Sequence, residues 1–505
     1  MKSMNHADTE DRSGSPPNKR RRFTFVLLTM AAIAILVVAT GLHLSNSRTI
    51  KKVAVADPSM PDIILVSIDS LRPDHLGCYG YPKPTSPTID RLALGGVRCE
   101  NVISTTSWTL PAHAALFTGL YDSAHGLVAD DMRLAEAHET LAEILTQAGY
   151  QTAGFFGGPY LHPVFGLSQG FQTYESCMTT LPDNTNEKKI RKQARIPNSV
   201  SHADVTGPQT LEKFSRWLEK ADKRPMFVFL HLWDVHYDYV PPKKYIELFD
   251  PNYEGQLVAT NYLRNPAIAQ GMTVRDLEHV RALYDGEIRF TDDMLGEMLA
   301  ALERKGRDRQ SLIVVTADHG EEFFDHGGKG HTRTLYDEVI KVPLIWSWTG
   351  NLPGGTAVTD QVRLIDIMPT ILGLANVKLE SEIQGRDISP LLRGDALDAQ
   401  TALCELHLPN RKALAFRTSQ LKVHKLLKPA GQLLFNLGED PGEHKPLDHD
   451  TEEFRKLLAQ LQKTTRDSLN LYAARAKGTA QEAQVTEELL QRLQSLGYVG
   501  DTKEE

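Results

Sequence analysis

Short apolar runs rich in β-branched residues recur along the chain, and segments of helical spacing separate them. The apolar runs are residues 63–68, 151–156, 226–230 and 312–316. The helical segments are residues 140–149, the stretch with Leu211, Phe214 and Leu218, and residues 274–304. A short apolar run is typical of a buried strand. Strands that alternate with helices predict an α/β fold, with a large, mixed but mostly parallel sheet flanked by helices.

The pattern changes near residue 400, where short strand-like runs follow one another with only turns between them. These runs are residues 403–407, 413–418, 422–427 and 433–437. They predict a small antiparallel sheet, and residues 452–475 and 487–496 then have helical spacing. We therefore predict a large domain at residues 61–400, a C-terminal subdomain at 401–478 and a helical tail at 479–505.

An uncharged segment, residues 23–42, follows the basic run from Lys19 to Arg22. A helix of this length spans about 30 Å, the thickness of a bilayer core. Because basic flanks stay in the cytoplasm, the remainder is predicted to be periplasmic or extracellular. The predicted segments are a cytoplasmic tail at 1–22, a transmembrane signal-anchor at 23–44 and a linker at 45–60. A cleaved signal peptide, with Ala39 and Gly41 near the cut, is the alternative and also exports the chain.

Composition narrows the class of protein only slightly. Hydrophobic residues make up 41% of the chain and charged residues 24%, as in an ordinary globular protein. The net charge of -8 gives no sign of a nucleic-acid partner. The four cysteines, Cys78, Cys99, Cys177 and Cys404, are widely spaced, so the sequence leaves both disulfides and buried thiols open.

Polar side chains gather where three of the predicted strands end. Asp69 follows the first strand, Asp234 and His236 follow a later one, and Asp318 and His319 follow residues 312–316. In open α/β sheets, ligands bind outside the carboxyl ends of the strands. A carboxylate beside an imidazole at such an end suits a divalent metal ion. The sequence thus predicts a metal site at this edge of the sheet.

A helix start lies between the first two of these strands, in residues 107–119. Pro111 at a first helical position, followed by an Ala/Leu run, predicts that the helix begins there, with Thr109 just before it. A hydroxyl at a helix N-terminus near a metal can be held as a nucleophilic alkoxide, because the metal charge and the helix dipole both favour the anion. The alternative is that Thr109 only caps the helix.

Taken together, these motifs resemble the sulfatase family within the alkaline phosphatase superfamily, from about residue 62 to residue 500. The matching segments are residues 68–74, 78–81, 109–113, 231–236, 283–287, 316–321, 335–338, 342–345, 364–370, 434–437 and 440–443. The resemblance implies the fold predicted above, with a catalytic domain at residues 61–400.

The chain also departs from the family pattern. Typical sulfatases carry a Cys that is oxidised to formylglycine, and Thr109 at that place cannot be oxidised in this way. His113 replaces the family's arginine, and Ser70 replaces the second of two adjacent aspartates. The remaining set of Asp69, Thr109, Asp318 and His319 resembles the single-metal site of lipoteichoic acid synthases and phosphoethanolamine transferases.

The resemblance implies roles for these residues. Asp69, Thr109, Asp318 and His319 would bind one divalent ion, with Zn or Mn favoured over Ca because of the histidine. Asp234, His236 and His331 could supply a second ion. Thr109 would be the nucleophile, and His236 or His331 would protonate the leaving oxygen. Lys329 or His331 would bind the ester group, and His113 would either contact substrate or pack.

The predicted function is an exported, membrane-anchored, metal-dependent hydrolase of sulfate or phosphate esters, with Thr109 as nucleophile. Its substrate would be a sulfated or phosphorylated small molecule, glycan or lipid. One alternative is an envelope phosphotransferase that moves a phospho-headgroup onto a glycan or lipid. The other is a catalytically inactive binding protein that keeps the fold.

Overall fold

The computed structural model describes residues 60–178, 205–428, 430–448, 451–475, 481–486 and 489–490. The predicted cytoplasmic tail, the signal-anchor at 23–44, the linker up to residue 59 and most of the tail at 479–505 lie outside these ranges. Among the described residues, no helix combines the length and the apolar character needed to cross a bilayer.

An eight-stranded sheet forms the centre of the fold, in the order β11-β2-β10-β7-β1-β6-β4-β5. The bounds in that order are Thr356–Arg363, Val97–Ile103, Lys341–Ser347, Ser311–Thr316, Asp62–Ile68, Met226–Leu232, Gln151–Phe156 and Thr173–Ser176. Only β10 runs antiparallel to its neighbours, and β1 pairs in parallel with both β6 and β7. The predicted fold class, a mixed and mostly parallel sheet, is confirmed.

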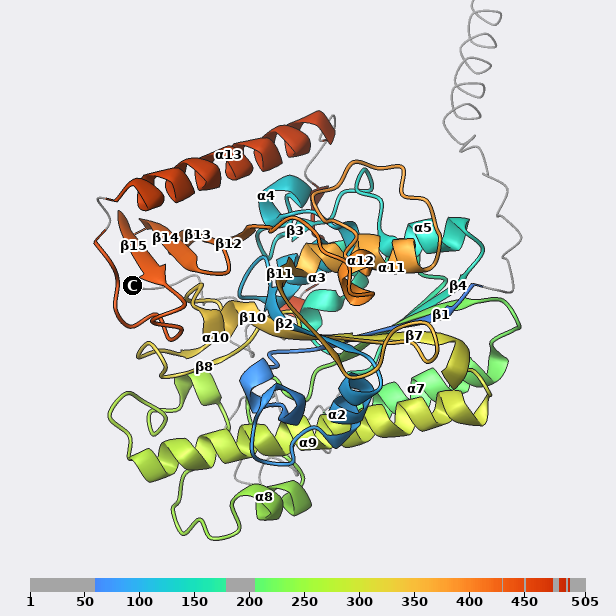
Figure 1. Ribbon diagram of the computed structural model, residues 1–505. Helices are drawn as coiled ribbons and strands as arrows, with labels where there is room; N and C mark the ends of the chain where they lie inside the picture. Colours follow the sequence, from blue (N-terminus) through green and yellow to red (C-terminus); the bar gives the residue numbers. More distant parts are fainter. Residues whose placement is uncertain are drawn as a thin grey trace, which may run out of the picture. The chain divides into compact units, whose positions relative to one another are not determined.

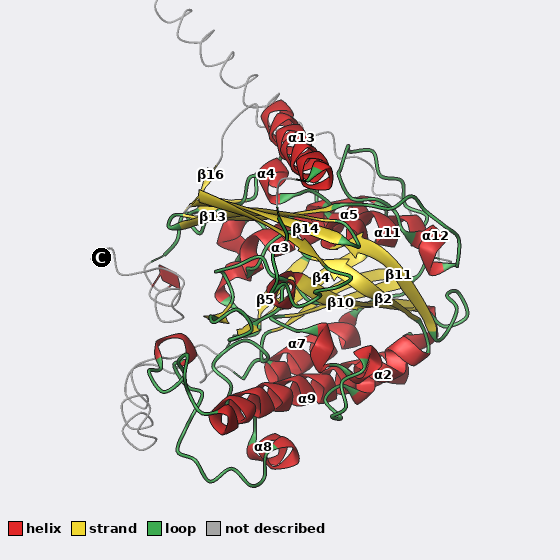
Figure 2. Ribbon diagram, turned by 60° about the vertical axis from the view of Figure 1, so that its left-hand side comes forward, coloured by secondary structure: helices red, strands yellow, loops and turns green. Residues whose placement is uncertain are grey.

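Helices cover both faces of this sheet (Figures 1 and 2). One face carries α3 (Thr109–Thr118), α5 (Leu141–Gln147), α11 (Ile367–Leu374) and α12 (Ser389–Leu392). The other carries α2 (Pro87–Leu94), α7 (Gly207–Lys220) and the long, unbroken α9 (Val274–Arg304), with α8 (Lys243–Phe249) against α9. Because both faces are covered, every residue of β1 is buried, which explains its continuous apolar sequence.

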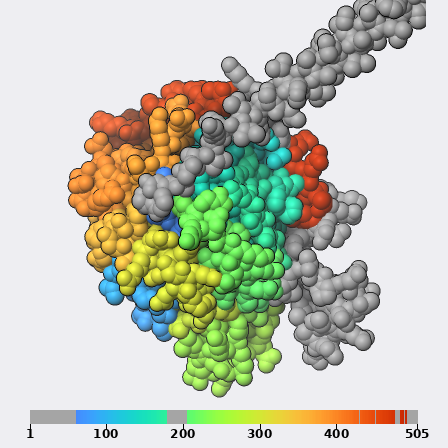
Figure 3. Space-filling model, turned by 90° about the vertical axis from the view of Figure 1, so that its right-hand side faces the viewer, coloured from blue at the N-terminus to red at the C-terminus, as the bar shows by residue number. Residues whose placement is uncertain are grey.

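The amino ends of the parallel strands are closed by an ion pair. Asp62, at the start of β1, is buried and accepts from the Arg307 guanidinium at 2.8 Å. Gln151, at the start of β4, donates to the backbone of Asp222 and Arg224, and Arg307 bonds the same two carbonyls. Figure 3 views this side, where segments coloured teal, green and yellow adjoin. The polar residues of the predicted site gather at the opposite, carboxyl edge.

A second sheet contains four antiparallel strands, β12 (Ala402–Leu408), β13 (Arg411–Arg417), β14 (Leu421–Lys428) and β15 (Ala430–Asn436). The helix α13 (Glu452–Arg475) packs on one of its faces (Figure 1). A separate apolar cluster between them includes Phe416, Leu434 and Leu461. The predicted small antiparallel sheet is confirmed, whereas the predicted domain boundary near residue 400 stays a prediction. All four cysteines are unpaired.

Replacing Leu461 with alanine is expected to lower the free energy of unfolding by about 2–5 kcal/mol, because this fully buried side chain joins α13 to the second sheet. Leu469 lies on the same helix with 52% of its surface exposed. Leu469→Ala should therefore change stability by no more than about 0.5 kcal/mol. Denaturant unfolding of both variants measures the difference, and equal losses would contradict the packing of α13 on this sheet.

Candidate active site

The carboxyl ends of three neighbouring strands bring the predicted metal ligands together. Strand β1 lies between β7 and β6, all parallel, so residues that follow them meet at one edge. Asp69 follows β1, and Asp318 and His319 follow β7. All three side chains are fully buried, and one ligand atom from each lies within 4.8 Å of the others. The sequence motifs therefore form one compact group of candidate ligands.

Thr109 lies beside this group at the start of α3. Its Oγ1 is 3.4 Å from Asp69 Oδ2 and 3.4 Å from His319 Nε2. The prediction that the helix begins at Pro111, with Thr109 before it, is wrong: Trp108 is the extended cap residue and Thr109 is already helical. The first helical hydrogen bond, from the Ala112 N–H to the Trp108 carbonyl, comes after Pro111. Proline fits there because first-turn N–H groups have no helical acceptor.

Ser70 aligns the two carboxylates. Its backbone has φ 56, the left-handed region that few residues other than glycine adopt. In this conformation the Ser70 N–H donates to Asp318 Oδ1 at 3.2 Å, and the Ser70 hydroxyl donates to Asp69 Oδ1 at 2.7 Å. Ser70 therefore leaves Asp69 Oδ2 and Asp318 Oδ2 directed toward the histidines.

His231, to which the sequence assigned no role, is part of the same edge. Its Nδ1 lies 2.9 Å from the Gly157 carbonyl and must donate, because a carbonyl only accepts. Its Nε2 then carries a lone pair 3.4 Å from Asp69 Oδ2. Burial lowers the pKa of His231 to about 4, so the imidazole is neutral near pH 7.

A backbone carbonyl fixes the tautomer of His319 in the same way. Its Nδ1–H donates to the Gly320 carbonyl at 2.9 Å, which leaves the Nε2 lone pair 3.4 Å from Asp318 Oδ2. Burial, together with the charge of Asp318, raises the pKa of Asp69 to about 7. Asp318 Oδ2 and His231 Nε2 have no hydrogen-bond donor among the described residues. Buried acceptors that face one another call for a cation between them, so these residues fit a divalent metal ion.

The residues predicted for a second ion do not form such a group. Asp234 accepts two hydrogen bonds from Thr206, from its N–H at 2.7 Å and from its hydroxyl at 2.9 Å. His236 donates through Nδ1 to the Tyr237 carbonyl and stacks on Trp233. Within the described part of the chain, each group of three metal-ligating side chains contains Asp318, and none contains Asp234, His236 or His331.

The two predicted proton donors lie next to the ligand group. The ring centre of His331 is 4.3 Å from that of His319 and 5.0 Å from that of His236. Its Nδ1 lies 3.4 Å from Glu321 Oε2, which also accepts from the Tyr239 hydroxyl. Burial lowers the pKa of His331 to about 4. His331 thus lies between His319 and His236, and the role of the two histidines as proton donors stays a prediction.

The two predicted substrate-binding residues are arranged differently. The Lys329 ammonium donates to the carbonyls of Asn265, at 3.2 Å, and Ile268, so it holds a neighbouring loop. His113 is fully buried, and its Nδ1–H donates to the Thr109 carbonyl at 2.9 Å. Its Nε2 lies 3.0 Å from the Ser67 hydroxyl. These contacts favour the packing role of His113 over substrate contact, and the substrate-binding roles stay predictions.

Comparison with known proteins establishes the family. The family model described as Sulfatase matches residues 61–377, and the one described as N-sulphoglucosamine sulphohydrolase, C-terminal, matches residues 322–470. The first covers more than half of the chain. The chain therefore belongs to the sulfatase family of ester hydrolases, within the alkaline phosphatase superfamily, as the sequence motifs predicted.

The individual relatives have low sequence identity to this chain, but the matches cover most of both chains. The chain is 25% identical to the ulvan-active sulfatase of Formosa agariphila, over 80% of this chain and 80% of that protein. It is 26% identical to arylsulfatase A of Homo sapiens, over 77% of this chain and 83% of that protein. The solved phosphonate monoester hydrolase of Agrobacterium radiobacter has a TM-score of 0.62 at 22% identity, over 85% of this chain and 98% of that one.

Proposed function

We propose that this chain is an exported, membrane-anchored and metal-dependent hydrolase of sulfate or phosphate esters, in which Thr109 is the nucleophile. The observation that carries the proposal is the Thr109 hydroxyl, 3.4 Å from both Asp69 Oδ2 and His319 Nε2. A purely structural threonine at the start of α3 would not require two buried carboxylates and two imidazole lone pairs around it.

Asp69, Asp318 and His319 would hold one divalent ion, with His231 as a further candidate ligand. Such an ion supplies positive charge that favours the alkoxide form of a hydroxyl and stabilises the oxygens of the ester group. The mixed donor set of carboxylate and imidazole favours Zn or Mn over Ca. Ser70 would keep both carboxylates aligned through its two hydrogen bonds.

The chain's own groups would carry the remaining chemistry. Thr109 Oγ1 attacks sulfur or phosphorus, its proton passes to a neighbouring base, and the bond to the leaving oxygen breaks. His331 or His236 gives a proton to that oxygen. Because burial lowers the pKa of His331 to about 4, the imidazole must take up its proton within the cycle, and this proton is the one that the neighbouring base has received from the Thr109 hydroxyl. Water then hydrolyses the ester on Thr109.

One observation supports a sulfate ester as the substrate and another supports a phosphate ester, so the proposal includes both. The relatives named ulvan-active sulfatase and arylsulfatase A support a sulfate ester. Threonine, which cannot become formylglycine, supports the direct ester chemistry of phosphotransferases. With an acceptor alcohol in place of water, the same centre would act as an envelope phosphotransferase on a glycan or lipid.

The test is a panel of an aryl sulfate, a phosphate monoester, a phosphate diester and a phosphonate monoester. The purified protein is freed of metal by chelation and then supplied with Zn, Mn or Ca. Turnover of at least one ester that returns with one metal supports the proposal, and the preferred ester selects between sulfur and phosphorus. A protein that binds metal but turns over none of the esters would be the binding protein instead.

The membrane anchor has its own test, because residues 23–42 are uncharged and follow four basic residues. A reporter active only outside the cytoplasm, fused after residue 60, is expected to be active and to sediment with membranes. A matched fusion with Lys19 to Arg22 replaced by glutamine should lose part of this orientation. Activity of a cytoplasmic reporter at the same junction would contradict the anchor.

A further inference from the structure

A cavity of about 440 Å³ lies outside the candidate ligand group, and we call it the lateral cavity. Its lining residues are Arg72, Pro73, Asp74, Tyr79, Asn101, Asp325, His326, Asp337, Glu338, Lys341, Arg417, Ser419, Leu437, Pro441, Gly442 and His444. Its wall thus joins the loops that follow Asp69 and His319 to the second sheet. Neither Thr109 nor a candidate metal ligand lines it, so it is a separate site.

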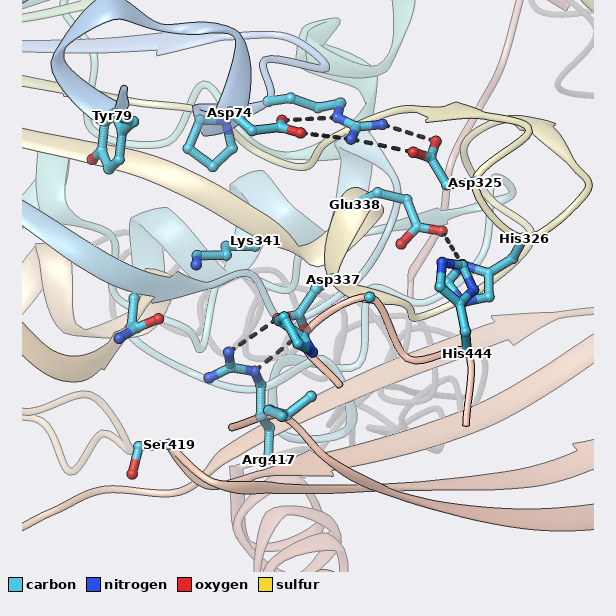
Figure 4. A pocket seen from close by; sticks show the side chains of 16 residues that line it. Asp74, Tyr79, Asp325, His326, Asp337, Glu338, Lys341, Arg417, Ser419 and His444 are labelled. Atoms are coloured by element: carbon cyan, nitrogen blue, oxygen red, sulfur yellow. Dashed lines mark hydrogen bonds and ion pairs between the residues drawn. The ribbon is translucent and has the colours of Figure 1, made fainter. Parts of the chain in front are cut away.

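The charges on one wall of the lateral cavity neutralise one another. Arg72 forms ion pairs with Asp74 at 2.8 Å and with Asp325 at 2.9 Å, as the dashed lines of Figure 4 show. Arg72 also donates to the Glu321 carbonyl, which ties this wall to the loop of the active site. Arg281 lies 4.0 Å from Asp325, so two arginines face the two carboxylates of Asp74 and Asp325. This wall therefore presents no unmatched charge.

The opposite walls are matched in the same way. Asp337 pairs with Arg417 at 3.0 Å and with Lys422 at 2.8 Å, and Lys422 also pairs with Glu443 at 2.9 Å. Glu338 pairs with His326 at 2.7 Å; burial lowers the pKa of His326, but the hydrogen bond and the charge of Glu338 outweigh it and leave this pKa raised. Every acidic side chain of the lining is therefore already bound to a cation.

Lys341 differs from the other charged side chains named above, because it has no ion-pair partner among the described residues. It begins β10 at the carboxyl edge of the large sheet, and among the described residues it has no hydrogen-bond partner and no ion pair for its ammonium group. Figure 4 places its side chain between Asp74 and Tyr79 on one side and Arg417 and Ser419 on the other. Burial lowers the pKa of Lys341 although Asp337 is near. Although Asp337, Asp74 and Glu100 act on its charge from a distance, the half-buried ammonium has no partner at hydrogen-bond or ion-pair distance among the described residues, and a bound anion would supply one.

We propose that the lateral cavity binds an anionic group, a sulfate, phosphate or carboxylate, through the ammonium of Lys341. The side chains of Asn101 and Ser419 and the ring of His444 line the same space and can donate neutral hydrogen bonds to the oxygens of the anion. The cavity is larger than a single oxyanion, so it also has room for a sugar that carries the anionic group. The anion is therefore bound either free from solution or as part of such a sugar. In both cases the recognition chemistry is a charge-assisted hydrogen bond from Lys341.

Anomalous diffraction from crystals of the full chain soaked in selenate, an analogue of sulfate, tests the site directly. The expected result is a selenium peak within hydrogen-bond distance of Lys341 Nζ that disappears in Lys341→Gln. An absent peak, or a peak that persists in Lys341→Gln and is thus an adventitious ion only, would overturn the proposal. A peak beside Thr109 is a separate result that concerns the active site.

Calorimetric titration with inorganic sulfate and with a sulfated disaccharide identifies the source of the anion. Lys341→Gln is expected to weaken binding by about tenfold or more, the effect of losing one charge-assisted bond. Lys378→Gln is the matched control, because this lysine is 84% exposed. Loss for both ligands indicates a free anion, and loss for the disaccharide alone indicates an anion on a sugar. Unchanged binding of both would refute the proposal, whereas turnover of a small aryl ester should not change.

Discussion

Thr109→Ala is expected to lower turnover by about a thousandfold or more, because removal of a catalytic nucleophile typically has effects of this size or larger. The Thr109 hydroxyl makes only long contacts, at 3.4 Å, so the fold should remain intact. Thr109→Ser retains the attacking oxygen and should keep part of the activity. Steady-state kinetics with the best ester of the panel, together with thermal unfolding, measure both effects.

Thr118 provides the matched control for this variant. It ends the same helix, is equally buried, and its hydroxyl donates only to the Ala114 carbonyl, at 2.6 Å. Thr118→Ala should therefore leave turnover within a small factor of the unmodified chain. If Thr109→Ala turned over nearly normally, or if both variants lost the same activity, Thr109 would be a structural residue and water would be the better nucleophile.

Asp318→Asn is expected to remove bound metal and activity together. Even a residue that only orients a ligand typically changes metal affinity by about 10–100-fold, so loss of a ligand should change it more. Asparagine can still accept from the Ser70 and His319 N–H groups through its oxygen, as Asp318 Oδ1 does. It places an amide NH2, which cannot ligate, at the other position. Elemental analysis of the purified variant gives the metal content.

The control for Asp318 is Asp308, in the turn at the amino end of the same strand β7. Asp308→Asn changes the same charge at the opposite edge of the sheet and should keep both metal and activity. Metal at the normal level in Asp318→Asn would show that Asp318 is not a ligand. Loss of metal in both variants would point to a general loss of structure.

The sequence predicted the strands that are buried on both faces. Strands β1, β6 and β7 lie side by side in the middle of the sheet and have continuous apolar sequences. Strand β10 was not predicted, because Pro343 interrupts its apolar run. The structure places Pro343 at the register shift between Val342 and Leu344, where a missing N–H is tolerated.

The remaining strands of the large sheet were missed for a different reason. Strand β2 alternates buried residues with partly exposed Arg98 and Glu100, and β11, at one edge, has exposed Thr359 and Asp360. Short strands of mixed polarity carry little apolar signal, and only their neighbours in the sheet define them. Their pairing depends on residues far apart in the chain, such as Val358 with Cys99.

The residues of the candidate site also differ in whether a local sequence pattern or only a distant contact reveals them. Asp69, Asp318 and His319 could be named as candidates from sequence because they follow apolar runs, and Thr109 because it lies at the start of a helix, although the helix begins two residues earlier than predicted. His231 could not be found, since it lies inside β6 and the apolar run there predicts only a strand. Its role depends on the Gly157 carbonyl, which fixes the tautomer, and on the pairing of β1 with β6. Neither contact is visible in one sequence.

The most direct test of the central claim is mass spectrometry of the enzyme quenched during turnover. We expect a peptide that contains Thr109 and carries the mass of one sulfuryl or phosphoryl group, with fragment ions that locate the group on Thr109. The adduct should be absent from Thr109→Ala and from enzyme without substrate. An adduct located on another residue, or turnover at saturating substrate with no adduct in the quenched enzyme, would contradict the assignment of Thr109 as the nucleophile.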